Sequence, residues 1–172
     1  MAEISLILGG ARSGKSAYAL HLAGKAKKKA VFIATCQALD KEIAERIELH
    51  KKTRPKSWRT FEEPYKVSLL LNKIGNKFEV ILIDCLTLLV SNLMLKGRKA
   101  DVIAKEVNGI FDALGKTKAK AVIVSNEVGL GIVPDNKIGR VFRDVAGRIN
   151  QLAAGRSDEV YFMISGIPWK IK

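Results

Sequence analysis

Cysteine and histidine are scarce in this chain, and their scarcity excludes some kinds of site. The 172 residues contain two cysteines, Cys36 and Cys85, and two histidines, His21 and His50. No Cys-x-x-Cys pair occurs, and two histidines are too few for a Cys/His zinc site. We therefore expect reduced thiols in a cytosolic protein, and a chain this long buries enough surface to form a core without disulfides.

Targeting and membrane-spanning segments are also lacking. Met1–Glu3 precedes an apolar run and a glycine-rich turn instead of a basic region and a cleavage site, so no signal peptide is expected. The longest apolar stretch, Val80–Leu95, carries Asp84 and Asn92 and is too short to span a bilayer. These absences predict a cytoplasmic protein in which residues 1–172 form a single domain.

Positive charge is what the chain has in excess. Lys and Arg number 30 against 17 Asp and Glu, which gives a net charge of +13, while the hydrophobic fraction of 48% is ordinary. This balance excludes an acidic disordered chain. It predicts an anionic partner, which is a nucleic acid, a phosphorylated small molecule or a membrane surface.

Short apolar runs alternate with helical patterns along the chain. Strands are predicted where Val and Ile gather, at Ile4–Leu8, Ala30–Thr35, Phe78–Ile83, Ala121–Val124 and Glu159–Ile164. Helices are predicted at Ser16–Ala26, Leu39–Lys52, Tyr65–Ile74, Leu86–Leu95, Val102–Leu114 and Lys137–Ala154. The polar segment Lys56–Pro64 is expected to be irregular, and a short tail follows Gly166. Continuous apolar strands separated by helices predict an α/β domain whose parallel sheet is covered on both faces.

A phosphate-binding loop follows the first predicted strand. The segment Gly9-Gly10-Ala11-Arg12-Ser13-Gly14-Lys15-Ser16 fits the pattern G-x-x-x-x-G-K-[ST]. The glycines let backbone N–H groups surround phosphate oxygens, and the helix that begins here adds the positive end of its dipole. Lys15 can reach the β- and γ-phosphates, and the Ser16 hydroxyl can bind Mg²⁺.

A second metal ligand is expected at the end of another strand. Asp84 closes the apolar run Val80–Ile83, where a buried carboxylate is costly unless a cation lies nearby. We therefore predict that Ser16 and Asp84 hold Mg²⁺ together. The alternative is that Asp84 only caps the helix that starts near Leu86.

His50 lies on the apolar face of its predicted helix. At about 100° per residue, Leu39, Ile43, Ile47 and His50 fall within about 80° of one another. The following segment, residues 51–60, contains five basic residues and no acid. Such a cluster can bind a polyphosphate and keeps the imidazole neutral at pH 7, as a nucleophile toward phosphorus must be. From the spacing alone, a histidine packed at a helix end beside a solvated basic loop is the favoured interpretation.

Several segments taken together resemble one enzyme family. They are Gly9–Ser16, Ile33–Thr35, Arg46–His50 followed by Arg54-Pro55 and Trp58–Thr60, Asn126–Pro134, Phe142–Asn150 and Ser165–Ile167. In this order and spacing, from about Ile7 to Lys172, they resemble the bifunctional adenosylcobinamide kinase / adenosylcobinamide-phosphate guanylyltransferase of cobalamin biosynthesis.

The resemblance implies a RecA-like P-loop fold, a homotrimer and two reactions. In the first, ATP or GTP phosphorylates the hydroxyl of the aminopropanol arm of adenosylcobinamide, the corrinoid substrate. In the second, GTP transfers GMP to that phosphate through a guanylylated histidine, which gives adenosylcobinamide-GDP and pyrophosphate. The histidine of the family falls on His50.

The resemblance also implies the remaining nucleotide contacts. Besides Gly9–Ser16, these fall on Ala34, Thr35, Cys36, Lys51, Lys52, Thr53, Arg54, Glu62 and Asp84. Cys36 stands where a small polar residue such as Ser is expected, so a backbone contact survives there and a hydroxyl contact does not. Glu62 is expected to accept from guanine or from the ribose.

Other functions remain as alternatives. A monofunctional guanylyltransferase keeps only the second reaction, and a small-molecule P-loop kinase gives no role to His50. A nucleic-acid-dependent ATPase explains the charge of +13, but 6% aromatic residues and no separate basic arm support it poorly. A GTP-binding switch lacks a recognisable pair of switch motifs. The position of the basic segment beside His50 instead favours one bound nucleotide, with no nucleic acid and no membrane span.

Overall fold

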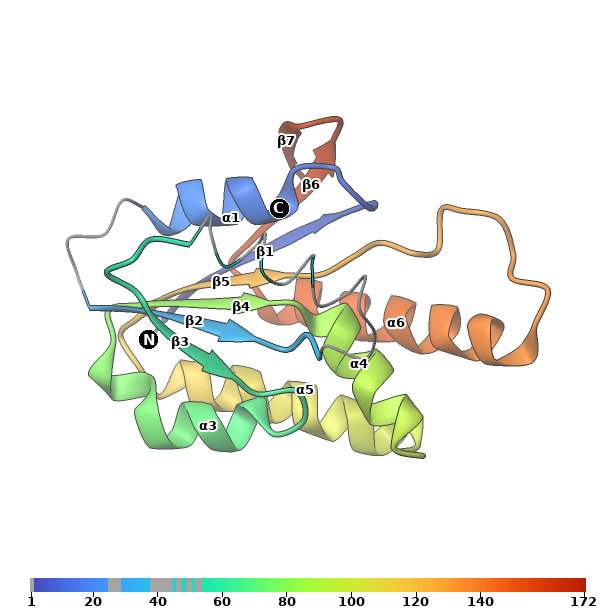
Figure 1. Ribbon diagram of the computed structural model, residues 1–172, viewed down its shortest axis with the longest axis horizontal. Helices are drawn as coiled ribbons and strands as arrows, with labels where there is room; N and C mark the ends of the chain where they lie inside the picture. The colour runs from blue at the N-terminus through green and yellow to red at the C-terminus, as the bar shows by residue number, and fades with distance from the viewer. Residues whose placement is uncertain (1, 25–28, 38–44, 46–47, 49–50, 52–53) are drawn as a thin grey trace.

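Seven strands form one sheet in the order β3-β2-β4-β5-β1-β6-β7 (Figure 1). The computed structural model describes residues 2–24, 29–37, 45, 48, 51 and 54–172. Its strands are β1 (Glu3–Gly9), β2 (Ala30–Ala34), β3 (Arg59–Glu62), β4 (Val80–Asp84), β5 (Lys120–Val124), β6 (Glu159–Ile164) and β7 (Ile167–Lys170). Its helices are α1 (Lys15–Ala23), α3 (Val67–Ile74), the short 3₁₀ helix η1 (Gly75–Lys77), α4 (Leu86–Leu95), α5 (Ala100–Gly115) and α6 (Lys137–Arg156).

Helices cover both faces of this sheet, as the continuous apolar strands predicted. Successive strand residues point to opposite faces, so each strand contributes to two cores. Ile33, Ile83 and Ile123 pack on the side of α3, α4, α5 and α6. Phe32, Leu82 and Val122 pack on the side of α1 (Figure 1). The predicted α/β class with a mostly parallel sheet is confirmed.

The carboxyl ends of the inner strands lie level with one another. Glu62 of β3 pairs with Ala34 of β2, Ala34 pairs with Asp84 of β4, and Asp84 pairs with Val124 of β5. In open α/β sheets, ligands bind outside this edge of the strands. The register therefore gathers the polar residues that follow β1, β2, β4 and β5 on the ligand-binding side.

Two strands lie where no strand was predicted. The segment Lys56–Pro64 is not irregular throughout, because Arg59–Glu62 pairs in parallel with β2 as the edge strand β3. The tail after Gly166 is also a strand, since β7 pairs antiparallel with β6. Both lack the apolar pattern of a central strand: three of four β3 residues and all four β7 residues are exposed.

The remaining elements agree with their predicted ranges to within a few residues. The bounds of α4 and β6 match, and α1 ends at Ala23, where Gly24 adopts a φ of 85°. Most of the predicted helix Leu39–Lys52 lies outside the described residues, although Glu45, Glu48 and Lys51 are helical. None of the helices in the described part of the chain has the length and apolar character needed to cross a membrane.

Candidate nucleotide-binding site

The glycine-rich segment connects β1 directly to α1, as predicted for a phosphate-binding loop. Gly9 has a φ of 149°, and a Cβ there would lie 2.8 Å from the Met163 carbonyl oxygen, so a side chain does not fit. Gly14 has a φ of 93° immediately before the first turn of α1. These two positions need glycine because the loop turns tightly and packs against β6 before α1 begins.

Lys15 lies beneath this loop and is only 7% exposed. Its Nζ donates a hydrogen bond to the carbonyl oxygen of Gly10. Burial lowers the pKa of Lys15, whereas the charge of Asp84 acts in the opposite direction. The ammonium is thus aimed at the start of the loop and held near a carboxylate.

Ser16 and Asp84 meet across the sheet edge, as predicted from the sequence. Ser16 Oγ donates to Asp84 Oδ2 at 2.8 Å. One hydroxyl and one carboxylate fit Mg²⁺, which keeps several waters and takes its other ligands from substrate phosphates. Among the described residues no three His, Cys, Asp or Glu side chains gather as a metal site, so a metal held by protein side chains alone is not seen in that part of the chain.

Thr35 fixes the backbone at the end of β4. Its hydroxyl accepts from the Cys85 N–H at 2.8 Å and donates to the Cys85 carbonyl oxygen at 2.7 Å, while its own N–H donates to the Asp84 carbonyl oxygen at 3.1 Å. These bonds hold Asp84 at the point where β4 enters α4. The neighbouring Cys36 is half-buried, and burial, reinforced by Asp84, raises the pKa of its thiol.

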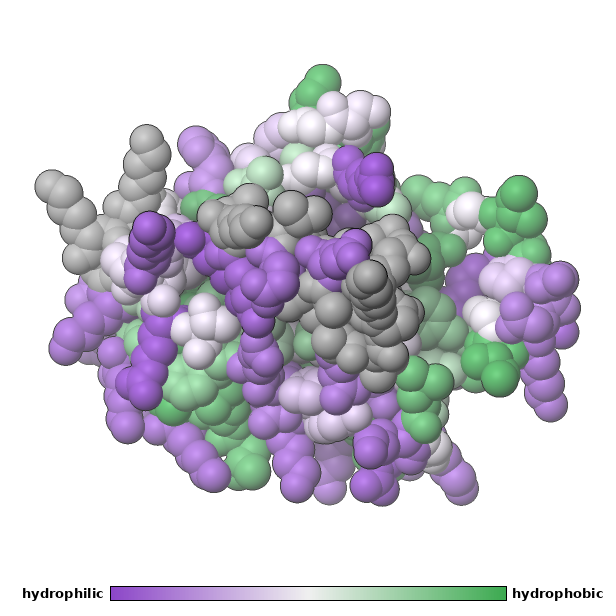
Figure 2. All heavy atoms as spheres, viewed as in Figure 1, coloured by the Kyte–Doolittle hydropathy of each residue, from purple (hydrophilic) through white to green (hydrophobic). Residues whose placement is uncertain are grey.

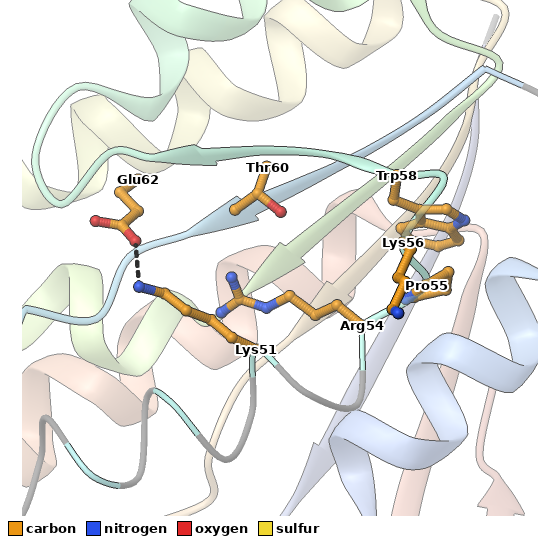
Figure 3. A pocket seen from close by; sticks show the side chains of 7 residues that line it. All are labelled: Lys51, Arg54, Pro55, Lys56, Trp58, Thr60 and Glu62. Carbon is orange, nitrogen blue, oxygen red and sulfur yellow. Dashed lines mark ion pairs between the residues drawn. The ribbon is translucent and has the colours of Figure 1, made fainter.

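A pocket of about 370 Å³ opens beside β3. It is lined by Lys51, Arg54, Pro55, Lys56, Trp58, Thr60 and Glu62 (Figure 3). Lys51 and Arg54 reach toward the Glu62 end of β3, and Lys51 Nζ lies 3.2 Å from Glu62 Oε1. Hydrogen bonds to Glu48 and Glu62 raise the pKa of Lys51. Three basic side chains against one carboxylate leave this pocket positive, as an anionic ligand requires.

Arg54 is the most enclosed cation of this pocket. Its guanidinium stacks over the Phe32 ring at 4.1 Å from the centroid. Burial lowers the pKa of Arg54, and the opposing charges of Asp84 and Glu62 act against that effect. Its Nε is buried and has no hydrogen-bond partner among the described residues. A buried guanidinium with an unused donor is suited to bind a phosphate or carboxylate.

The structure brings most of the sequence-predicted nucleotide residues to one edge of the sheet. Gly9–Ser16, Ala34–Cys36 and Asp84 lie at the ends of β1, β2 and β4, and Glu62 ends β3 beside them. The predicted nucleophile His50 lies outside the described residues, as do Lys52 and Thr53. Sequence reasoning missed Trp58 and Thr60 as pocket-lining residues, although both belong to a segment that was quoted for the resemblance.

Fold and site together define a P-loop nucleotide-binding protein of the RecA-like class. Two solved structures share the fold. An ATPase from the type III secretion system of pathogenic bacteria aligns with a TM-score of 0.59 at 12% identity, over 93% of this chain and 50% of its own. A KaiC-like protein from Pyrococcus horikoshii aligns with a TM-score of 0.55 at 11% identity, over 93% of this chain and 70% of its own.

Within this class the chain belongs to the CobU family, cobinamide kinase / cobinamide phosphate guanyltransferase, whose model matches residues 5–171. It is 42% identical to the bifunctional adenosylcobalamin biosynthesis protein CobU of Escherichia coli and of Salmonella typhimurium, over 97% of this chain and 98% of each relative. It is 40% identical to the bifunctional CobP of Pseudomonas aeruginosa, over 97% of this chain and 96% of that one. The predicted family is confirmed.

Proposed function

We propose that this chain phosphorylates adenosylcobinamide with ATP or GTP and then transfers GMP from GTP to the resulting phosphate. The products are adenosylcobinamide-GDP and pyrophosphate. The observation that carries this proposal is the near full-length match to bifunctional relatives, in a chain whose P-loop meets Asp84 through Ser16. The match covers 98% of the Escherichia coli relative, so no large part of that protein is missing here.

The P-loop and the positive pocket bind different parts of the nucleotide. Backbone N–H groups of Gly10–Gly14 and the Lys15 ammonium bind the phosphates, whose negative charge the start of α1 also favours. The pocket beside β3 takes the rest of the nucleotide, with Glu62 as an acceptor for guanine or ribose and the basic side chains Lys51 and Arg54 for its negative charge. Support comes from the register of the strands, in which Glu62 of β3 and Asp84 of β4 end level with Ala34 of β2, the strand between them.

Ser16 and Asp84 are the residues that would hold Mg²⁺. When bound there, the ion neutralises charge on phosphate oxygens of the nucleotide. The chain's own groups supply the rest: Lys15 and Arg54 stabilise the charge that develops on the departing nucleoside diphosphate or pyrophosphate. Both cations are partly buried, which strengthens their attraction to an anion relative to that of a solvated lysine.

Guanylyl transfer proceeds through His50 in this proposal. The neutral imidazole forms a bond to the α-phosphorus of GTP, and the bond to the bridging oxygen of pyrophosphate breaks with its electron pair. The phosphate of the phosphorylated cobinamide then displaces the imidazole. The resemblance supports this role, and the basic residues Lys51 and Arg54 that follow His50 face the same pocket.

Two further features belong to the proposal. The resemblance implies that the enzyme acts as a homotrimer, and its sequence leads us to expect that it works in the cytoplasm.

The proposal is tested by product analysis. The protein is incubated with adenosylcobinamide, ATP, GTP and Mg²⁺, and the corrinoids are identified by mass spectrometry. We expect the phosphate ester first and the GDP derivative next, with both lost in Lys15→Ala and retained in the exposed-site control Lys77→Ala. Conversion of added cobinamide phosphate without any kinase product would indicate a monofunctional guanylyltransferase, and no product in either assay would contradict the proposal.

A further inference from the structure

The chain segment that follows β5 brings a glutamate to the P-loop. Ser125 donates its N–H to the Ile7 carbonyl oxygen at 2.9 Å, and Glu127 donates its N–H to the Gly9 carbonyl oxygen at 2.9 Å. The segment that follows β5 therefore stays hydrogen-bonded to β1 beyond the end of the regular sheet. Glu127 is attached to the residue that opens the phosphate-binding loop.

This end of the loop is where the terminal phosphate of a nucleotide belongs. A P-loop lysine reaches the β- and γ-phosphates, and Lys15 Nζ already points to the Gly10 carbonyl oxygen. Gly10 is the neighbour of Gly9, the residue to which Glu127 is bonded. The glutamate thus lies beside the Gly9–Gly10 end of the loop, after the strand β5 that lies between β1 with its P-loop and β4 with Asp84.

A buried network fixes the direction of this carboxylate. Asn150 of α6 is 5% exposed, and its Nδ2 donates to the Asn126 carbonyl oxygen at 3.0 Å and to Glu127 Oε2 at 3.4 Å. Ser125 Oγ donates to Asn150 Oδ1 at 2.7 Å and thereby sets which way the amide faces. Thr87 of α4 completes the network through its contact of 2.9 Å with Ser125 Oγ. Three elements therefore hold one side chain in place.

The second carboxylate oxygen has the shorter contact. Glu127 Oε1 accepts from the Gly129 N–H at 2.6 Å. A Cβ on Gly129 would lie 2.8 Å from that same oxygen, so only glycine leaves the carboxylate where it is. Both partners are uncharged N–H groups, and no ion pair to Glu127 occurs in the part of the chain that the structure describes. The oxygens retain lone pairs for a further proton.

We propose that Glu127 is the general base of the kinase step, an assignment that rests on the proposed function. The carboxylate accepts the proton of the substrate hydroxyl while the hydroxyl oxygen forms its bond to the γ-phosphorus. The bond from the γ-phosphorus to the β,γ-bridging oxygen breaks, and its electron pair leaves with the nucleoside diphosphate. Asp84, the carboxylate that ends β4, is engaged by Ser16 on the metal side.

Glu127→Gln tests this assignment, because the amide keeps the size of the side chain but accepts no proton. General bases contribute about 10²–10⁴-fold, so transfer of the γ-phosphate of ATP to adenosylcobinamide should fall by that factor. Guanylyl transfer from GTP, measured with cobinamide phosphate supplied, involves no hydroxyl and should persist. The matched control is Glu79→Gln, an exposed carboxylate beside the opposite end of β4.

Two further variants separate chemistry from structure. Gly129→Ala displaces the carboxylate without removing it and should also lower the kinase rate selectively. Glu127→Ala should regain kinase activity when formate or acetate is added, since a small carboxylate can occupy the vacated space and take the proton.

Failure of the general-base assignment can be distinguished from failure of the proposed function. If the unaltered enzyme does not phosphorylate adenosylcobinamide, the proposed function fails. If it does, a Glu127→Gln kinase rate within a few-fold of the unaltered rate overturns the general-base assignment. Loss of both activities together, with no rescue by formate, overturns it as well, because it shows a purely structural role.

Discussion

Asp84 shows how a single side chain depends on cations around it. It ends a buried strand, where an isolated carboxylate is disfavoured. Ser16 donates to it, and the positive charges of Lys15 and Arg54 are near enough to influence its surroundings. The hydroxyl of Ser16 and these cations therefore lie around the carboxylate at the point between the P-loop and β4 where we propose that a metal binds.

We expect Asp84→Asn to remove the effect of Mg²⁺ on nucleotide binding. The amide has one oxygen and no charge, so GTP affinity measured by calorimetry with Mg²⁺ should fall at least about tenfold, a loss of about 1.4 kcal/mol. Affinity in EDTA should change little. Asp112→Asn, whose residue pairs with Arg156 on the helical side, is the control. An unchanged Mg²⁺ effect would show that Asp84 holds no metal.

Arg54→Met separates binding from stability. Methionine keeps an apolar side chain over Phe32 but removes the charge and the buried Nε that has no described partner. An unpaired buried donor destabilises a fold by about 1–3 kcal/mol, so the unfolding free energy should stay level or rise. GTP affinity should fall, because the guanidinium is the enclosed cation of the pocket. Urea unfolding and calorimetry measure the two effects, and a variant that loses stability but not affinity would contradict this role.

At the scale of elements, the two edge strands differ from the inner ones in a way that explains why they were not predicted. β3 carries Arg59, Thr60 and Glu62, all exposed, and β7 contains Pro168, which an edge strand tolerates because its N–H is not required. Neither sequence carries a run of Val and Ile, and pairing with a neighbouring strand of the sheet makes them strands.

The inner strands and the P-loop part of the site were predictable because their sequences carry a clear pattern. Burial on both faces imposes continuous Val and Ile runs, and a P-loop imposes fixed spacing. The contact of Asn150 with Glu127 joins residues 23 positions apart and needs the fold to appear. Trp58 and Thr60 likewise come to line the pocket only because the chain forms β3 there. The role of His50 remains a prediction.

The β6–β7 hairpin contains an ion pair whose contribution to stability depends on pH. Lys170 donates to Glu159 across this pair and lowers the pKa of that carboxyl below its usual value. A depressed carboxyl pKa stabilises the fold above about pH 4.5, and that contribution disappears as pH falls through the folded pKa. Lys170→Met should therefore lower the unfolding free energy by roughly 0.2–1 kcal/mol at pH 7 and hardly at all near pH 3.

Urea unfolding at both pH values measures this difference. Lys118→Met, at an exposed lysine before β5, is the control and should show no such dependence. Equal destabilisation at both pH values would mean that Lys170 acts by packing alone.

On the scale of the whole molecule, an apolar projection accompanies the positive surface. The loop after β5 and the first turns of α6 extend from the body (Figure 1), and apolar atoms gather there in Figure 2. Leu130 is 80% exposed and Ile132 is 96% exposed, with Val133, Ile138 and Val141 also exposed. Contiguous exposed apolar surface is typical of a protein interface.

We expect this projection to contribute to the homotrimer that the family resemblance implies. The double variant Leu130→Asp/Ile132→Asp should shift the protein toward monomer in sedimentation equilibrium, with unchanged far-UV circular dichroism. Leu95→Asp, at an exposed position that ends α4, is the control. A trimer that survives the double variant would place the interface elsewhere.

The distribution of positive charge over the whole molecule also indicates the kind of ligand that is bound. The excess of +13 is compatible with nonspecific nucleic-acid binding, but the described cations that line the pocket, Lys51, Arg54 and Lys56, lie beside the ends of β2 and β3. This concentration of positive charge in one pocket favours a small anionic ligand over nonspecific nucleic-acid binding.

The central claim is that this nucleotide transfers GMP to His50, and labelling tests it most directly. The protein is incubated with GTP carrying a labelled α-phosphate, denatured, and assayed for covalent label that is acid-labile and alkali-stable, as a histidine phosphoramidate is. We predict that the unaltered enzyme and His21→Ala, the variant of the other histidine, take up label and that His50→Ala does not. Label on His50→Ala, or none on the unaltered enzyme, would contradict the account.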